Sequence, residues 1–236
     1  MKHKIIAVLL TVTSFIFLAP VYAAKPVMGV AEFDNTSGAA WWSGGVGMEL
    51  SGMLTNELAN SKNFTMVERS KIESVLQEQD LAGAGRTSPG TGAKIGKLTG
   101  AQYIVLSTVT AYENNVEDTG GGISYGGISI GGKKKSSYIA VDLRVVDSSS
   151  GEISFNRTVE ARSGGMGINF GIFKSGFGGA LKKQKKTPAG KAIRAVMVEI
   201  VDYLSCAMVV KGNCMAEFDA KEAKRKESLK SAIQLD

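Results

Sequence analysis

Two short stretches of the sequence have the glycine–serine pattern that surrounds the nucleophile of many serine hydrolases. They are residues 122–126 (GISYG) and 127–131 (GISIG). A serine nucleophile of this kind needs a sharp strand-to-helix turn and a histidine as its base. The only histidine, His3, lies inside an N-terminal export signal, and no helical pattern follows either stretch. We therefore interpret both stretches as the Gly/Ser face of β-strands.

No other grouping of residues points to catalysis. Gly44, Gly45 and Gly47 precede a predicted helix, but they complete neither a dinucleotide fingerprint nor a Walker sequence, and a flexible loop explains them better. The carboxylates are scattered, without a pair in an apolar setting that could serve as general acid and base. We expect no catalytic, cofactor-binding or metal-binding residues, and hence neither an enzyme nor a cofactor.

The two cysteines, Cys206 and Cys214, are separated by seven residues. In a protein that leaves the reducing compartment, this spacing favours a disulfide that closes a short loop. The alternative is a free Cys206 buried on the apolar side of a helix.

The first 23 residues are typical of a cleavable export signal. Lys2 and Lys4 form a positive head, an apolar run spans Ile5–Leu18, and Val21 with Ala23 fit a small-residue cleavage rule. A retained membrane anchor is the alternative, but the run is short of the ~20 residues that a spanning helix needs. We expect cleavage after Ala23 and export from the cytoplasm.

The charge of the mature chain is mild. Loss of Lys2 and Lys4 lowers the formal net charge from +6 to +4, which gives no argument for a nucleic-acid partner. The positive charges gather at Lys133–Lys135, within residues 182–186 and along the tail that begins at Lys221. Each cluster is most simply a solvated loop or helix face, with membrane phosphates as a possible contact.

The N-terminal half alternates strand and helix patterns. A strand at Pro26–Phe33 and a loop at 34–47, which holds the only tryptophans, precede a helix with a stripe of Leu50, Met53, Leu54 and Leu58. A short strand at Phe64–Glu68 follows. Ser70 and Glu73 then form a capping box for a helix that we expect to be buried through Ile72, Val75 and Leu76.

The C-terminal half supplies further strands and a long helix. A short helix is expected near 93–98, and strands at 103–112, 137–147 and 152–161. Thr187 and Pro188 begin a long helix that is buried through Ile193, Val196, Met197, Ile200 and Leu204. Residues 24–112, 137–161 and 187–210 are thus expected to form one α/β domain, followed by a charged, helical tail at 211–236.

Two Gly-rich segments do not fit this domain: residues 113–136, with part of 137–147, and residues 162–186. Met166, Ile168, Phe170 and Ile172 alternate with small or polar residues, and Ile123 and Tyr125 begin a weaker alternation. This period is typical of a strand between lipid and water. We predict two membrane hairpins, with those six residues facing lipid and with Lys133–Lys135 at the tip of the first.

Several stretches resemble one family. AVDLRVVD at 140–147 and SGEI at 150–153 resemble the signature of CsgG, the curli secretion channel of the outer membrane. SGML at 51–54, MVER at 66–69, LTGAQYI at 98–104 and YENNV at 112–116 match in order and spacing, so the resemblance covers Pro26–Leu204.

The resemblance implies a periplasmic α/β domain whose two hairpins join those of neighbouring subunits in one transmembrane β-barrel. It implies a nonameric homo-oligomeric ring that exports unfolded curli-type polypeptides by diffusion without ATP, helped by accessory proteins. It also implies a constriction loop, with an aromatic at Trp42 and Trp41 beside it. The alternative for these tryptophans is burial in the core beneath the loop.

Two features depart from the family. No cysteine lies near the cleavage site to carry the family's lipid anchor, and the return strand at 176–186 is short and rich in lysine. Both features leave a second hypothesis open, in which the protein is a soluble periplasmic adaptor or regulator of an envelope assembly machine.

Overall fold

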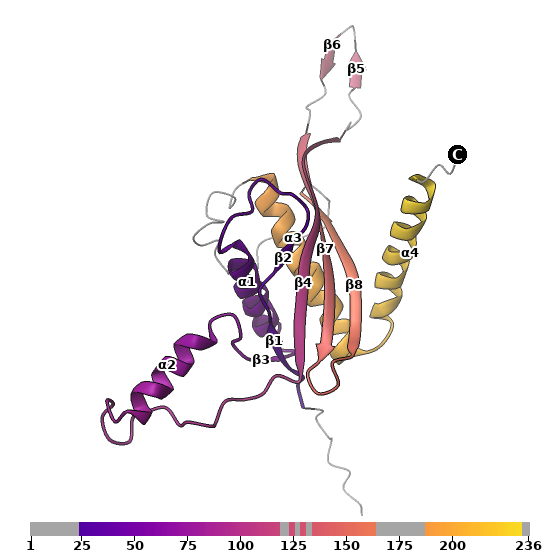
Figure 1. Ribbon diagram of the computed structural model, residues 1–236. Helices are drawn as coiled ribbons and strands as arrows, with labels where there is room; N and C mark the ends of the chain where they lie inside the picture. Colours follow the sequence, from indigo (N-terminus) through magenta and orange to yellow (C-terminus); the bar gives the residue numbers. More distant parts are fainter. Residues whose placement is uncertain (1–23, 119–122, 126–127, 131–133, 164–186, 233–236) are drawn as a thin grey trace, which may run out of the picture.

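A mixed sheet forms the centre of the molecule. The computed structural model describes residues 24–118, 123–125, 128–130, 134–163 and 187–232 (Figure 1). The sheet has the order β3-β1-β4-β7-β8, with β2 paired to β4. Its strands are β1 (Val27–Val30), β2 (Asp34–Asn35), β3 (Thr65–Met66), β4 (Tyr103–Asp118), β7 (Lys134–Asp147) and β8 (Ile153–Arg162).

The sheet is parallel at one edge and antiparallel at the other. β1 pairs in parallel with both β3 and β4, whereas β4, β7 and β8 form an antiparallel meander. The N-terminal order of strand, helix, strand and helix agrees with the periodicity of the sequence, apart from the additional two-residue strand β2. The expected mixed α/β domain is therefore confirmed.

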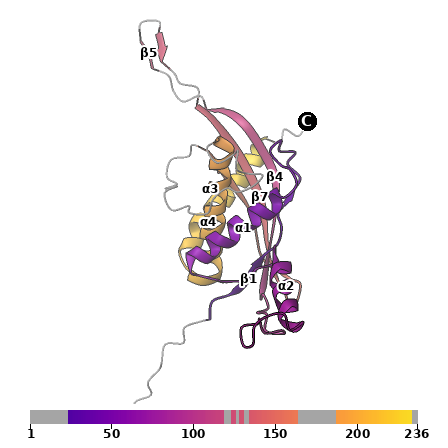
Figure 2. The same cartoon turned by 90° about the vertical axis from the view of Figure 1, so that its left-hand side faces the viewer.

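Two helices cover one face of the sheet. They are α1 (Val46–Ser61) and α3 (Pro188–Leu204), and Figure 2 shows them on the same side of the strands. Leu54, Ile193 and Ile200 are fully buried against Val105, Val141 and other inward-facing strand residues. The opposite face is polar, because the alternate positions of β7 are the exposed Asp142 and Arg144.

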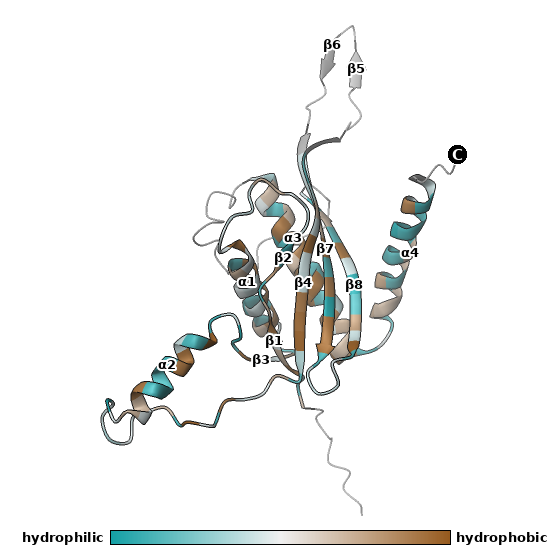
Figure 3. Ribbon diagram, in the orientation of Figure 1, coloured by the Kyte–Doolittle hydropathy of each residue, from teal (hydrophilic) through white to brown (hydrophobic). Residues whose placement is uncertain are grey.

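Helix α3 begins where the sequence predicts. The Thr187 side chain accepts a hydrogen bond from the Gly190 backbone N–H at 3.2 Å, and Pro188 occupies the first turn. The helix continues into a π-helical segment η3 (Ser205–Val210), and α4 (Cys214–Ala232) follows. Helix α4 is predominantly hydrophilic (Figure 3), in agreement with the predicted charged helical tail.

Helix α2 (Ile72–Gly83) differs from the prediction. Its N-cap is Lys71, which makes no side-chain capping bond, and the Ser70 hydroxyl bonds the Glu68 carboxylate at 2.9 Å instead. Val75 and Leu76 are exposed rather than buried. The pattern identified an amphipathic helix correctly, but α2 lies away from the sheet, so its apolar stripe has no core to meet (Figure 1).

The chain between α2 and β4 also differs from the prediction. The short helix expected near residues 93–98 is absent, and this stretch consists of turns and irregular backbone. Gly96, at positive φ, interrupts any helical run there, and Gly90, also at positive φ, lies shortly before it. We call residues 70–101, which include α2 and this returning chain, the arm.

The β4–β7 ladder runs beyond the packed domain. It is paired from Tyr103↔Asp147 to Asp118↔Lys134, with register shifts that leave Thr110 and Asn115 of β4 unopposed. Farther along, β5 (Ile123–Tyr125) pairs antiparallel with β6 (Ile128–Ile130). Lys134 and Lys135 therefore lie in the ladder, opposite Asp118 and Glu117, and the prediction that they form the hairpin tip is wrong.

Candidate functional site

The loop between β2 and α1 holds both tryptophans, and short-range hydrogen bonds shape it. The Asn35 carboxamide oxygen accepts bonds from the Ser37 backbone N–H at 3.0 Å and from the Ser37 hydroxyl at 2.6 Å. The Thr36 N–H donates to the Val109 carbonyl at 2.9 Å, which fixes the start of the loop to β4. The loop therefore leaves the sheet in a defined direction.

The end of the loop requires glycine at two positions. Gly45 has a φ of +86°, in the left-handed region, as the N-cap of α1. A Cβ on Gly47 would clash with the Phe33 carbonyl oxygen, so only glycine allows α1 to approach the chain between β1 and β2 this closely. The glycine cluster therefore serves backbone packing, which accounts for it without a bound phosphate.

The tryptophans have different surroundings. Trp41 stacks edge-on to Tyr112 of β4, with ring centroids 5.4 Å apart, and its centroid lies 5.8 Å from that of Trp42. The Trp41 indole N–H is buried without a hydrogen-bond partner. Trp42 instead lines an open hollow of about 430 Å³ together with Glu32, Asp34 and the loop glycines. Both side chains are partly buried and pack against the core, so Trp41 is the supported member of the pair and Trp42 the accessible one.

Tyr112 was not singled out from the sequence. Inward-facing residues of β4 have odd numbers up to Val109, but the unopposed Thr110 shifts the register and places Tyr112 opposite the buried Ile139. Strict alternation assigns Tyr112 to the wrong face. Only the pairing partner reveals that it supports Trp41.

A polar cluster, in which Ser137 and Ser163 are buried, lies where β4, β7 and β8 leave the packed domain. The Ser163 hydroxyl accepts the Ser137 backbone N–H at 2.7 Å, and the Ser137 hydroxyl donates to the Asn114 carboxamide oxygen at 3.0 Å. Beside it, Tyr138 is a poor acid, because burial and then the Glu160 carboxylate raise the pKa of its phenol. This cluster ties three strands together at the base of the two Gly-rich segments.

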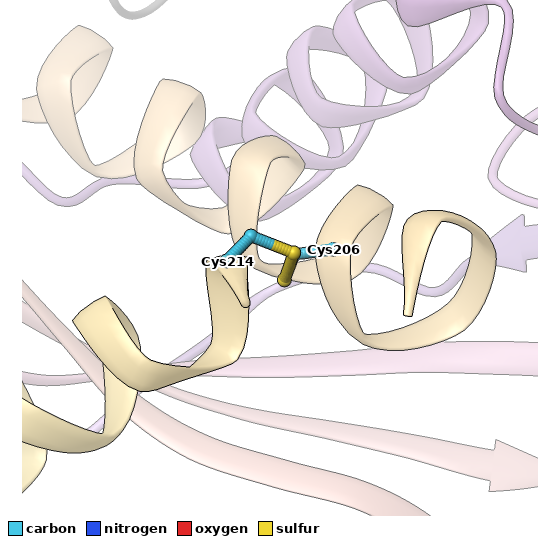
Figure 4. The surroundings of a disulfide bond; sticks show 2 residues. All are labelled: Cys206 and Cys214. Carbon is cyan, nitrogen blue, oxygen red and sulfur yellow. A yellow bond between two sulfur atoms is a disulfide. The ribbon is translucent and has the colours of Figure 1, made fainter. Parts of the chain in front are cut away.

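The cysteines form a second feature. Cys206 in η3 and Cys214 at the start of α4 are joined in a disulfide, with a Cα–Cα distance of 6.0 Å (Figure 4). An open groove of about 770 Å³ lies beside it and includes Val210, Glu199, Asp202, Glu217 and Lys221 among its lining residues. We call this feature the disulfide groove.

The disulfide groove is predominantly acidic. Lys221 is its single cation, and it bridges Glu199 at 2.9 Å and Glu217 at 3.0 Å. Burial alone would lower the pKa of the Lys221 ammonium, but its hydrogen bonds to both carboxylates prevail and raise it. The Asp202 side chain is exposed, but its partial burial in the groove, together with nearby Glu199, raises its pKa.

The predicted lipid-facing residues are only partly covered by the structure. Ile123 lies opposite Ile130 and Tyr125 opposite Ile128 in the β5–β6 pair. Met166, Ile168, Phe170 and Ile172 lie outside the described residues, as does the export signal. Among the described residues, no group of three or more potential metal-binding side chains occurs, and no helix is long and apolar enough to traverse a bilayer.

Sequence comparisons point to one family. Residues 13–233 match the family described as the curli production assembly/transport component CsgG. The protein of that name from Citrobacter koseri is 30% identical over 145 residues, which make up 57% of this chain and 52% of that protein. The one from Escherichia coli K12 is 33% identical over 120 residues, 49% of this chain and 43% of that protein. The chain thus spans about half the length of the curated relatives it matches.

Solved structures offer only distant likenesses. The hypothetical protein CT253 from Chlamydia trachomatis has 16% identity and a TM-score of 0.46, over 80% of this chain and all of that one. A PelC dodecamer from Paraburkholderia phytofirmans has 12% identity and a TM-score of 0.39, over 79% of this chain and 91% of that one.

Proposed function

Because the chain belongs to the curli production assembly/transport component CsgG family, we propose that it is a subunit of an outer-membrane secretion channel. The channel passes unfolded curli-type polypeptides by diffusion, without ATP. The family match over residues 13–233 is the observation that carries this proposal. The packed domain would lie in the periplasm, beneath the membrane.

The β4–β7 ladder supports a shared barrel. It leaves the packed domain as a paired ribbon (Figure 1), as one arm of a membrane hairpin would. Two hairpins, at 113–136 and 162–186, would give each subunit four strands. Since even the smallest barrels need about eight strands, subunits would have to close the barrel together as a homo-oligomeric ring, nonameric if it follows the family resemblance.

The loop between β2 and α1 supplies the proposed constriction. Trp42 borders an open hollow, whereas Trp41 rests on Tyr112. We assign Trp42 to the pore lining and Trp41 to the support beneath it. A ring of indoles would let a flexible chain thread past while it excludes folded proteins.

Replacement of each tryptophan tests this assignment. Trp42→Ala should raise single-channel conductance in planar bilayers and leave assembly intact. Trp41→Ala should lower the melting temperature, because its ring packs on Tyr112 and the core. Equal conductance for wild type and Trp42→Ala would refute the constriction.

Outer-membrane fractionation with electron microscopy tests the channel itself. We expect detergent-extracted protein to form rings with a lumen and to conduct ions in planar bilayers. A dispersed monomer in the soluble periplasmic fraction would contradict the channel and support the adaptor hypothesis.

The predicted membrane strand offers a position-specific test. Ile168→Arg should block insertion, at a cost of about 2–4 kcal/mol near the bilayer midplane, whereas Asn169→Arg should insert and change ion selectivity. Heat-sensitive oligomer bands in outer-membrane fractions report insertion. Equal behaviour of these neighbouring variants would rule out the membrane strand.

A further inference from the structure

The arm carries an apolar surface that the fold leaves uncovered. Val75, Leu76, Leu81, Ile95 and Leu98 are between 36% and 64% exposed. They lie on a segment that projects from the sheet (Figures 1 and 3). Five large apolar side chains left exposed on one projecting segment indicate an interaction surface.

The end of the arm is folded back on itself. A Cβ on Gly83 would lie 2.9 Å from the Ile95 side chain, and one on Gly92 would lie 2.9 Å from the Ala82 Cβ. The returning chain therefore packs closely against the end of α2. This contact holds the side chain of Ile95, the most exposed of the five apolar residues, next to Gly83 at the end of α2.

The same end of the arm is purely cationic. Residues 81–98, which we call the arm tip, contain Arg86, Lys94 and Lys97 and no carboxylate. All three cations are exposed. A partner for the arm tip should therefore offer apolar contact beside negative charge.

The disulfide groove offers that combination. Val210 is 63% exposed beside it, and three carboxylates, from Glu199, Asp202 and Glu217, face the single ammonium of Lys221. The raised pKa of Asp202 reflects its partial burial and the neighbouring carboxylates, and a further cation would relieve that repulsion. The disulfide lines the groove and fixes the start of α4 at its border.

We propose that the arm tip of one subunit docks into the disulfide groove of the next subunit. Ile95 and Leu98 would cover Val210, while Lys94 and Lys97 would approach Asp202. The arm and the start of α4 lie on opposite sides of the sheet in Figure 1. The contact is therefore head to tail, and repeated contacts of that kind close a ring when the rotation between subunits allows it.

The inference rests on the proposed ring and adds the surface that builds it on the periplasmic side. It is tested by charge exchange in full-length protein extracted from outer membranes. Lys94→Glu and Asp202→Lys should each lower the apparent assembly affinity by at least about tenfold, because each places like charges opposite one another. The double variant should recover most of the loss, since it restores an opposite-charge pair.

Lys71→Glu is the matched control, because it makes the same charge change at the root of the arm and outside the tip. It should assemble like the wild type. Mass photometry of the extracted protein gives the oligomer fraction, and a thermal melt of each subunit verifies its fold. Since Lys94 and Asp202 are exposed in the subunit, their replacement should leave the melt unchanged.

The possible failures are distinguishable. If the Lys94→Glu variant forms rings as well as the wild type, the docking is overturned and the channel proposal stands. The same holds if the double variant assembles as poorly as each single variant. A wild-type protein that never forms rings would overturn the proposed channel and the docking with it.

Discussion

The packed domain and the arm use the same sequence pattern with opposite results. Helices α1 and α2 both have apolar residues at helical spacing, yet Leu50, Leu54 and Leu58 are buried whereas Val75 and Leu76 are exposed. Helix α1 lies on the sheet, and α2 lies apart from it (Figure 1). The periodicity identifies an apolar face, but the position of the helix relative to the sheet decides whether the same chain covers that face.

The largest expected difference between the two regions concerns core truncation. Leu54→Ala should lower the free energy of unfolding by about 2–5 kcal/mol, because it leaves a cavity beneath α1. Leu76→Ala should change it by less than about 0.5 kcal/mol in the isolated subunit. Denaturant unfolding of both variants measures this; similar losses would mean that α2 is packed in the subunit after all.

The disulfide should stabilise the domain and leave the arm unaffected. Replacement of both Cys206 and Cys214 by alanine opens a loop with a sequence separation of 8 residues. By the loop-closure argument, this should cost about 2–3 kcal/mol. Hydrogen exchange should increase in η3 and the start of α4 and stay constant in α2. Increased exchange confined to α2 would contradict this placement of the disulfide.

Helix capping makes a smaller distinction. Thr187→Ala should cost about 1 kcal/mol, because it removes the side-chain acceptor for the Gly190 N–H at the start of α3. Ser70→Ala is the control before α2, where the hydroxyl bonds an exposed carboxylate rather than the helix backbone. Urea unfolding should show a larger loss of stability for Thr187→Ala than for Ser70→Ala. Equal losses would mean that Ser70 caps α2, as the sequence predicted.

The smallest expected effect is a pH dependence in α4. The Arg225 hydrogen bond lowers the pKa of Glu222 from its ordinary 4.5 to about 2. A lowered carboxyl pKa stabilises the fold above the unfolded value, so this contribution should disappear as the pH falls from about 4.5 to about 2. It should amount to less than about 1 kcal/mol at this surface position. Glu222→Gln should flatten that part of the stability profile measured by thermal melts; an unchanged profile would mean that the ion pair contributes nothing.

The sequence predicted the elements better than their environment. Thr187 with Pro188, the buried stripe of α3 and the charged last helix were all predicted correctly, because local patterns specify them. The cysteine spacing likewise indicated the bond that the structure forms. The exposure of Val75 was not predictable, since it depends on where the chain carries α2 after β3. Tyr112 was missed because one unopposed residue reverses the alternation of β4.

The two unopposed residues of β4 have a further consequence for the emerging ribbon. After each unopposed residue, the residues of β4 lie on the opposite face from the one that strict alternation predicts. β7 has no unopposed residue in its ladder with β4. Thr110 introduces one exchange and Asn115 a second, so their effects cancel by the end of β4. The second register shift thus compensates for the first within the same strand. Because a residue lies on the same face as its partner in β7, deletion of Thr110 should remove the irregularity and leave Tyr112 opposite Ile139.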